Sequence, residues 1–72
     1  MVYANKDNFV IAQAEVCMTI EQIAKASGVS KSMVHRMSKG YLVRPDKLGK
    51  VAKVLGVSAR DLIQTDEEVK KQ

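Results

Sequence analysis

The sequence predicts an all-α protein that folds as one compact domain of five short helices. Apolar residues recur at helical spacing almost throughout, and no run alternates β-branched with polar residues as a half-buried strand would. The single proline and the glycines mark the breaks between these periodic segments. A length of 72 residues fits one domain. We place that domain at residues 1–64 and expect the polar residues 65–72 to fray.

The first helix is expected at about Lys6 to Val16. Asn5 precedes it, and an asparagine side chain in this position can accept a hydrogen bond from an unpaired backbone N–H of the first turn. Phe9 and Ala12 then lie along one face together with Val16. We assign this face to the core.

The second helix is expected to begin at Thr19. Thr19 and Gln22 have the spacing of a capping box, in which each side chain accepts a hydrogen bond from the other residue's backbone N–H. Gly28 ends the helix, because glycine adopts the left-handed conformation needed there without a side-chain clash. Its inward-facing residues are Ile20, Ile23 and Ala24.

The third helix is expected from its cap, Ser30, to about Ser38, and Gly40 stops it. Val34 and Met37 are three residues apart and therefore point to the core. Pro45 begins a fourth helix, since a first turn does not need the N–H that proline lacks, and Gly56 closes it. Ser58 caps a short fifth helix. The inner residues of these last two helices are Leu48, Val51, Ala52, Leu55, Ala59, Leu62 and Ile63.

Two apolar features outside these helices have more than one interpretation. The connection after the third helix is expected to be a loop, and its residues Tyr41, Leu42 and Val43 form either a dimer contact or part of the core. Cys17 is interpreted as a small apolar filler, buried or half-buried, in preference to a reactive thiol. It is the single cysteine, so no intramolecular disulfide is possible.

Positive charge is concentrated in the middle of the chain. Residues 25–53 hold eight Lys or Arg residues and one acidic residue, Asp46, for a charge of +7. The whole chain carries +4, so the remainder carries 4 − 7 = −3. This segment indicates a polyanionic partner, nucleic acid before an anionic membrane surface. Its basic residues are spread over several helices instead of one amphipathic helix, which argues against the membrane.

Other classes of function have little support in the sequence. An enzyme is not expected, because the chain has one histidine, no serine or cysteine with a base at useful spacing, and no glycine-rich phosphate loop. Cys17 and His35 cannot form a zinc site alone, and we expect no metal, cofactor or small-molecule substrate. No apolar run approaches the roughly 20 residues of a membrane span, and the N-terminus lacks the order of a signal peptide. A cytoplasmic protein is therefore expected.

The packing assigned to the second and third helices leaves one set of side chains facing outward. Apolar residues fill the angle between the two helices across the turn at Gly28. The outer face of the third helix then carries Lys31, Ser32, His35 and Arg36. These side chains can hydrogen-bond or carry positive charge, which a helix in the DNA major groove needs. Each could instead be an ordinary solvated residue, and Met33 could pack on the second helix or touch a thymine methyl group.

Two stretches, "TIEQIAKASGVSKSMVHRMSKG" and "RPDKLGKVAKVLGVSARDLI", resemble the Cro and phage-repressor class of helix-turn-helix proteins, the lambda-repressor-like or XRE-type domain. The likeness covers about Phe9 to Ile63. The lactose-repressor class shares the first stretch, but the helix before it and the proline-started helix after it favour the Cro and repressor class. The resemblance implies a recognition helix at residues 30–38. It implies base contacts from Lys31, Ser32 and Arg36 with His35 nearby, and phosphate contacts from Thr19, Ser30, Lys39 and Arg44.

The chain departs from the family pattern at three places. Ile20 stands where a phosphate-contacting glutamine is frequent, so that contact is lost or passes to Thr19 and backbone N–H groups. Ser27 stands where an apolar residue is usual. Gln13 and Ser38 replace an arginine–glutamate pair, and the joint loss leaves no orphan charge.

The resulting hypothesis is a sequence-specific regulator of transcription that binds double-stranded DNA. We expect a small Cro-like repressor of a phage, plasmid or mobile element, located with the nucleoid in the cytoplasm. The family implies a homodimer on a two-fold symmetric operator. The alternative is an antitoxin-like or adaptor module that uses the same fold for protein interaction, with weak DNA binding.

Overall fold

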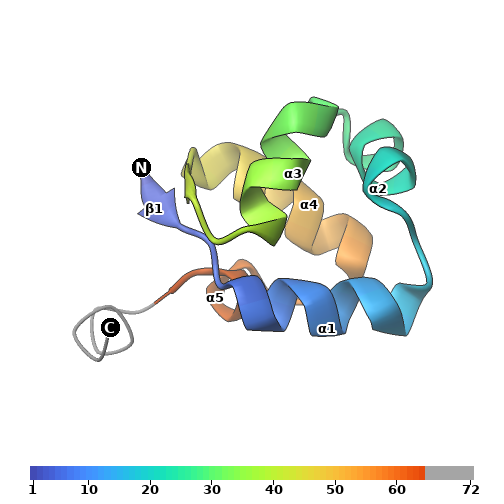
Figure 1. Ribbon diagram of the computed structural model, residues 1–72, viewed down its shortest axis with the longest axis horizontal. Coiled ribbons are helices and arrows are strands. Elements are labelled where there is room, and N and C mark those ends of the chain that lie inside the picture. Colours follow the sequence, from blue (N-terminus) through green and yellow to red (C-terminus); the bar gives the residue numbers. More distant parts are fainter. Residues whose placement is uncertain (65–72) are drawn as a thin grey trace.

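The computed structural model of the chain describes residues 1–64, which contain five helices (Figure 1). The fold class and the helices are as predicted. The tail that was expected to fray, residues 65–72, lies outside the described residues. In chain order the elements are β1 (Val2–Tyr3), α1 (Lys6–Val16), α2 (Ile20–Ser27), α3 (Lys31–Ser38), β2 (Leu42–Val43), α4 (Pro45–Leu55) and α5 (Ala59–Leu62).

Local signals in the sequence set where the helices begin. Asn5 Oδ1 accepts a hydrogen bond from the Asn8 N–H at 3.0 Å, so α1 begins at its predicted cap. Pro45 occupies the first turn of α4, where its missing N–H costs nothing. The N-caps of the other three helices are Thr19, Ser30 and Ser58, as predicted.

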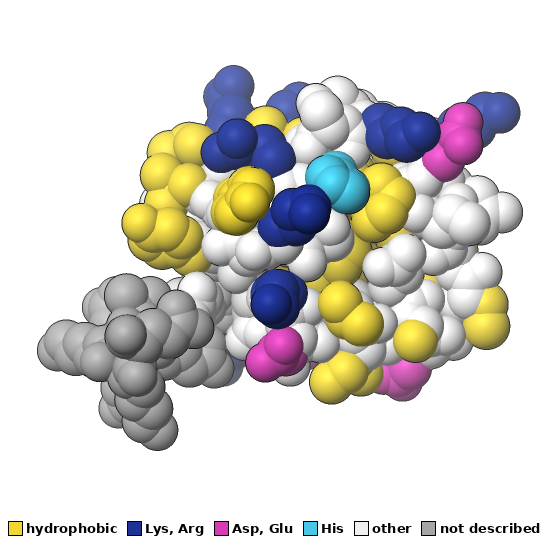
Figure 2. Space-filling model, viewed as in Figure 1, with side chains coloured by type: hydrophobic (Ala, Val, Ile, Leu, Met, Phe, Trp, Pro, Cys, Tyr) yellow, Lys and Arg dark blue, Asp and Glu magenta, His cyan; other side chains and the backbone are white. Residues whose placement is uncertain are grey.

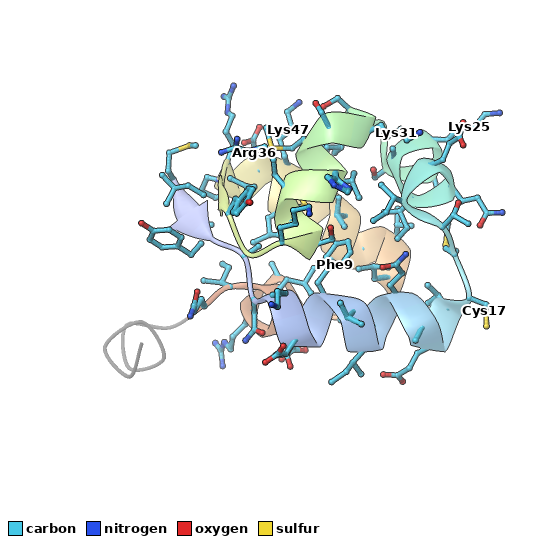
Figure 3. All side chains as sticks on the ribbon, in the orientation of Figure 1. Phe9, Cys17, Lys25, Lys31, Arg36 and Lys47 are labelled. Atoms are coloured by element: carbon cyan, nitrogen blue, oxygen red, sulfur yellow. The ribbon has the colours of Figure 1, made fainter. Side chains whose placement is uncertain are left out.

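The core is apolar and draws on every helix. The helix α4 packs against α2, α5 and α1, and α3 packs against α2 and α1. Phe9 is fully buried, and in Figure 3 it points from α1 toward the other helices. Among residues 1–64, no polar or charged side chain is buried. The buried residues are Ala4, Phe9, Ala12, Ile23, Ala24, Val29, Val34, Met37, Val43, Leu48, Val51, Ala52, Leu55 and Leu62.

The expectation that the chain forms no strands is wrong in one detail. The strand β1 pairs antiparallel with β2, with Tyr3 opposite Leu42, and Ala4 forms a further bridge to Ile63 on the C-terminal side. Strands of two residues are too short for an alternating pattern to be recognised. They form because tertiary packing brings the N-terminal residues beside both the α3–α4 connection and residues 62–64. We call this arrangement the terminal sheet, made of residues 2–4, 42–43 and 62–64.

The structure places the three apolar residues of the connection after α3 in different environments. Val43 is fully buried and belongs to the core, and Leu42 is half-buried. Tyr41 is 52% exposed and therefore contributes little to the core. The three residues thus have three different environments, which a single assignment could not describe.

Two other sequence interpretations are corrected by the structure. Cys17 is exposed, not buried, because it forms the left-handed C-cap of α1 with φ of 55° (Figure 3). The chain reverses there, and its side chain is turned away from the core. Gly49 does not mark a break but lies inside α4, where an added Cβ would meet no atom within 4 Å.

Candidate nucleic-acid interface

The candidate interface is built on the corner between α2 and α3. Gly28 ends α2 with φ of 74°, and its N–H donates to the Ala24 carbonyl at 2.9 Å. Val29 follows and is buried. Ser27 supports the turn, because its Oγ donates to the Ala24 carbonyl and accepts from the Val29 N–H, each at 3.3 Å. The departure from an apolar residue at this place is therefore compensated by hydrogen bonds within the corner.

The helix α3 has a clear inner side and a clear outer side. Val34 and Met37 are fully buried, and the half-buried Met33 packs against the core, as in the first of its two interpretations. The outer side carries the four side chains that the sequence assigned to base contacts, and all are exposed. They line one shallow, open hollow on the surface: Lys31, Ser32, His35 and Arg36.

Basic side chains surround this outer side of α3. Figure 2 shows most of the Lys and Arg side chains on this face of the molecule gathered around α3. In Figure 3, Lys31 and Arg36 lie toward opposite ends of α3, Lys25 of α2 lies beyond Lys31, and Lys47 of α4 lies between Arg36 and Lys31 in this view. The positive segment of the sequence thus folds into a surface that attracts a polyanion.

The residues that the sequence assigned to phosphate contacts are also exposed. Thr19 and Ser30 cap α2 and α3, and their hydroxyl oxygens accept backbone N–H groups at 3.1 and 3.2 Å. A helix N-terminus favours an anion nearby. Lys39 and Arg44 flank the connection after α3. Arg44 Nε lies 3.5 Å from Asp46 Oδ1 in an exposed ion pair, which is worth at most about 1 kcal/mol.

A Schellman motif ends α3 and determines where Lys39 lies. The Tyr41 N–H donates to the Arg36 carbonyl at 3.1 Å, and the Gly40 N–H donates to the Met37 carbonyl at 3.2 Å. Gly40 has φ of 77°, and a Cβ there would meet Lys6 Cβ at 3.3 Å. Glycine therefore suits both the left-handed backbone conformation and the close approach of the N-terminal segment.

Arg36 has partners that the sequence interpretation missed. Its Nη2 donates to the Leu42 carbonyl at 3.0 Å, and its Cζ lies 5.8 Å from the centre of the Tyr41 ring. The signal was available, because the residue after the glycine of a Schellman motif commonly contacts the helix residue five positions earlier. The strongest candidate for base reading is thus held by the connection that follows its own helix.

The other residues that depart from the family pattern also have nearby hydrogen-bond partners or packing contacts. Gln13 Nε2 donates to the Met18 carbonyl at 3.0 Å, across the α1–α2 turn. Ser38 Oγ donates to the His35 carbonyl at 2.6 Å. Ile20 is half-buried and packs against the core. Its hydrocarbon side chain cannot make a polar contact.

Within residues 1–64, no three His, Cys, Asp or Glu side chains are grouped so that they could hold a metal ion. No helix in this range is long and apolar enough to cross a membrane.

A family model described as helix-turn-helix matches residues 18–62, more than half of the chain. The matched range begins just before the cap of α2 and ends with α5, so it contains the corner, α3 and α4. No curated protein and no solved structure matches the chain.

Proposed function

Because this chain belongs to the helix-turn-helix family of the XRE and lambda-repressor type, whose members are DNA-binding regulators, we propose that it is a sequence-specific, Cro-like repressor of transcription. In this proposal α3 lies in the major groove of double-stranded DNA. There each base pair presents its own pattern of donors and acceptors. The proposed location is the cytoplasm, with the nucleoid.

The outer side of α3 is the observation that carries the proposal. On the inner side of α3, Val34 and Met37 anchor the helix in the core, so the opposite side is exposed. The four exposed side chains there combine two cations, a hydroxyl and an imidazole, which together can donate to and accept from base edges. The assigned base contacts are Lys31, Ser32, His35 and Arg36.

The exposed groups at the edges of this surface suit the sugar–phosphate backbone. In the proposal Thr19 and Ser30 present hydroxyls and helix N-termini to phosphates, and Lys39 and Arg44 present charge. Phosphate contacts fix register and orientation but carry no sequence information directly. Neutralising them releases counterions, so binding should weaken steeply with added salt.

We further propose that the chain binds as a homodimer on a two-fold symmetric operator. One α3 is only two turns long and reads a short half-site, so specificity over a genome would need two copies. The half-sites would then lie about one helical turn, roughly 34–36 Å, apart on one side of the duplex.

Selection from random oligonucleotides with the purified protein tests this proposal. We expect one consensus with two inverted half-sites, bound roughly a thousandfold or more tightly than random duplex DNA. Fluorescence anisotropy over a salt series should give a steep decrease in affinity. Weak binding without sequence preference would contradict the proposal and favour a protein-interaction module that uses the same fold.

A further inference from the structure

We propose that Tyr41 is a specificity-determining residue, which positions the Arg36 guanidinium for reading one base pair. The inference rests on the proposed function and adds a residue outside α3 to the reading surface. In this inference Tyr41 itself contacts no base. It acts by limiting the orientations of Arg36 before DNA is bound.

Two contacts fix the position of the Arg36 side chain. Its Nη2 donates to the Leu42 carbonyl at 3.0 Å, and the face of the Tyr41 ring lies 5.8 Å from Cζ. One contact is a hydrogen bond from a guanidinium nitrogen, and the other places the guanidinium carbon over the ring. Together they limit the positions that the guanidinium can take.

The backbone holds these two partners in place. The Tyr41 N–H is bound by the Arg36 carbonyl in the Schellman motif, and the Tyr41 carbonyl accepts from the Ala4 N–H at 3.3 Å. Leu42 is paired with Tyr3 in the terminal sheet. The connection that holds Arg36 is therefore fixed on one side by α3 and on the other by the terminal sheet.

The contacts leave enough donors for a base. A guanidinium has five N–H donors, and the Leu42 carbonyl uses one of them. Two parallel donors suffice to bind guanine O6 and N7. Because Arg36 remains exposed, a base edge can approach the rest of the group. A side chain already ordered loses less rotamer entropy on binding, so the contact strengthens the correct complex.

Tyr41 is a suitable position to test because its ring is not part of the core. It is 52% exposed, and its backbone hydrogen bonds do not depend on the side chain. Tyr41→Leu removes the aromatic face, whereas Tyr41→Phe keeps it and is the matched control. Tyr41→Gln is a second non-aromatic variant, to be used if the leucine variant does not fold by circular dichroism.

The experiment compares discrimination at one base pair. Arg36→Ala first identifies the operator base pair that Arg36 reads. At that base pair, a base substitution lowers the affinity of the unmodified protein but not that of Arg36→Ala. At that base pair, Tyr41→Leu should lower the ratio of affinities for the correct and the wrong base by about two- to fivefold, as expected for loss of an exposed cation–π contact. Tyr41→Phe should retain the ratio. Affinity for random DNA and the salt dependence should stay as in the unmodified protein, because the number of charges is unchanged.

An NMR readout separates positioning from a general loss of structure. The Arg36 side-chain protons should show an upfield ring-current shift in the unmodified protein and in Tyr41→Phe, and lose it in Tyr41→Leu. Unchanged discrimination in Tyr41→Leu, with specific binding intact in the unmodified protein, would overturn this inference alone. Tighter binding of Tyr41→Leu would overturn it too, since Tyr41 would then withhold Arg36 from DNA. Sequence-blind binding by the unmodified protein would overturn the proposed function itself.

Discussion

The α2–α3 corner and the terminal sheet are held together by contacts of very different range along the chain. In the corner, the hydrogen bonds join near neighbours, as in Thr19 with Gln22 and Gly28 with Ala24. In the terminal sheet, the Gln64 N–H donates to the Tyr3 carbonyl at 2.8 Å, across most of the described chain. The corner can therefore form early from local contacts, whereas the sheet must wait for the remainder to pack.

The two regions meet where α3 ends. The corner exposes the outer side of α3, but the connection beyond it is fixed by the terminal sheet. Arg36 belongs to the second half of α3 and contacts Leu42 of the terminal sheet. Local contacts therefore define α3, while the long-range contacts of the terminal sheet hold a partner of a side chain near its C-terminal end.

The largest expected effect compares the two regions by how much a truncated side chain in each lowers the free energy of unfolding. Ile23→Ala removes a fully buried side chain from α2 and should lower the free energy of unfolding by about 2–5 kcal/mol. Val2→Ala, at a half-buried residue of β1, should lower the free energy of unfolding by less than half as much. Urea denaturation followed by circular dichroism measures both. Equal losses would show that the terminal sheet is as important to stability as the corner.

The second effect compares two glycines of the same conformation. Gly28 and Gly40 have φ of 74° and 77°, so alanine at either should lower the free energy of unfolding by about 1 kcal/mol through backbone strain. Gly40→Ala should lower it further, because its Cβ would also meet Lys6 Cβ at 3.3 Å and the Ala4 carbonyl at 3.4 Å. At Gly28 nothing lies within 4 Å.

Gly49 provides the control for this glycine comparison. It lies inside α4 without a left-handed backbone and with open space around an added Cβ. Gly49→Ala should therefore raise the free energy of unfolding by about 0.5–1 kcal/mol. Thermal unfolding of Gly28→Ala, Gly40→Ala and Gly49→Ala measures the three changes in the free energy of unfolding. Equal losses at Gly28 and Gly40 would mean that the N-terminal segment yields to the new methyl group.

A third prediction concerns DNA binding at the point where the regions meet. Lys39→Ala should weaken binding to specific and random DNA alike and reduce the salt slope by about one, the loss of one phosphate contact. Arg60→Ala is the matched control, because this exposed residue of α5 lies outside the proposed interface. Anisotropy titrations over a salt series measure both. A changed sequence preference in Lys39→Ala would assign Lys39 to base reading instead.

A smaller effect tests the local hydrogen bonds of the corner. Thr19→Ala removes the hydroxyl that accepts the Gln22 N–H at 3.1 Å and should lower the free energy of unfolding by about 1 kcal/mol. Thr19→Ser retains the acceptor and should change it little. Chemical denaturation gives the two values. If serine were as damaging as alanine, packing of the threonine methyl group would matter more than the cap.

The smallest effect has the opposite sign and lies outside both regions. Cys17 is the one non-glycine residue with positive φ among residues 1–64. Cys17→Gly should raise the free energy of unfolding by about 0.5–1 kcal/mol, because glycine adopts this conformation without a Cβ clash. Thermal unfolding in the presence of a reductant measures it. A lower free energy of unfolding in Cys17→Gly would show that the Cys17 side chain makes a stabilising contact.

The helices could be predicted because their signals are local. Caps such as Thr19 and Ser30, the glycine at 28 and the helical spacing of Val34 and Met37 each act within a few residues. The exposure of the four candidate base-reading residues followed from the same spacing. The exposure of Cys17 could not be predicted from its apolar character, because it results from the left-handed helix cap that the residue forms.

What the sequence by itself determined is therefore the set of helices, the corner and the outward face of α3, since periodicity and capping depend on neighbours in the chain. The tertiary structure alone decided that residues 2–4, 42–43 and 62–64 meet at the terminal sheet, which holds the Leu42 carbonyl that accepts a hydrogen bond from Arg36. Two-residue strands have no local code. They are fixed only when the core brings distant segments within hydrogen-bonding distance.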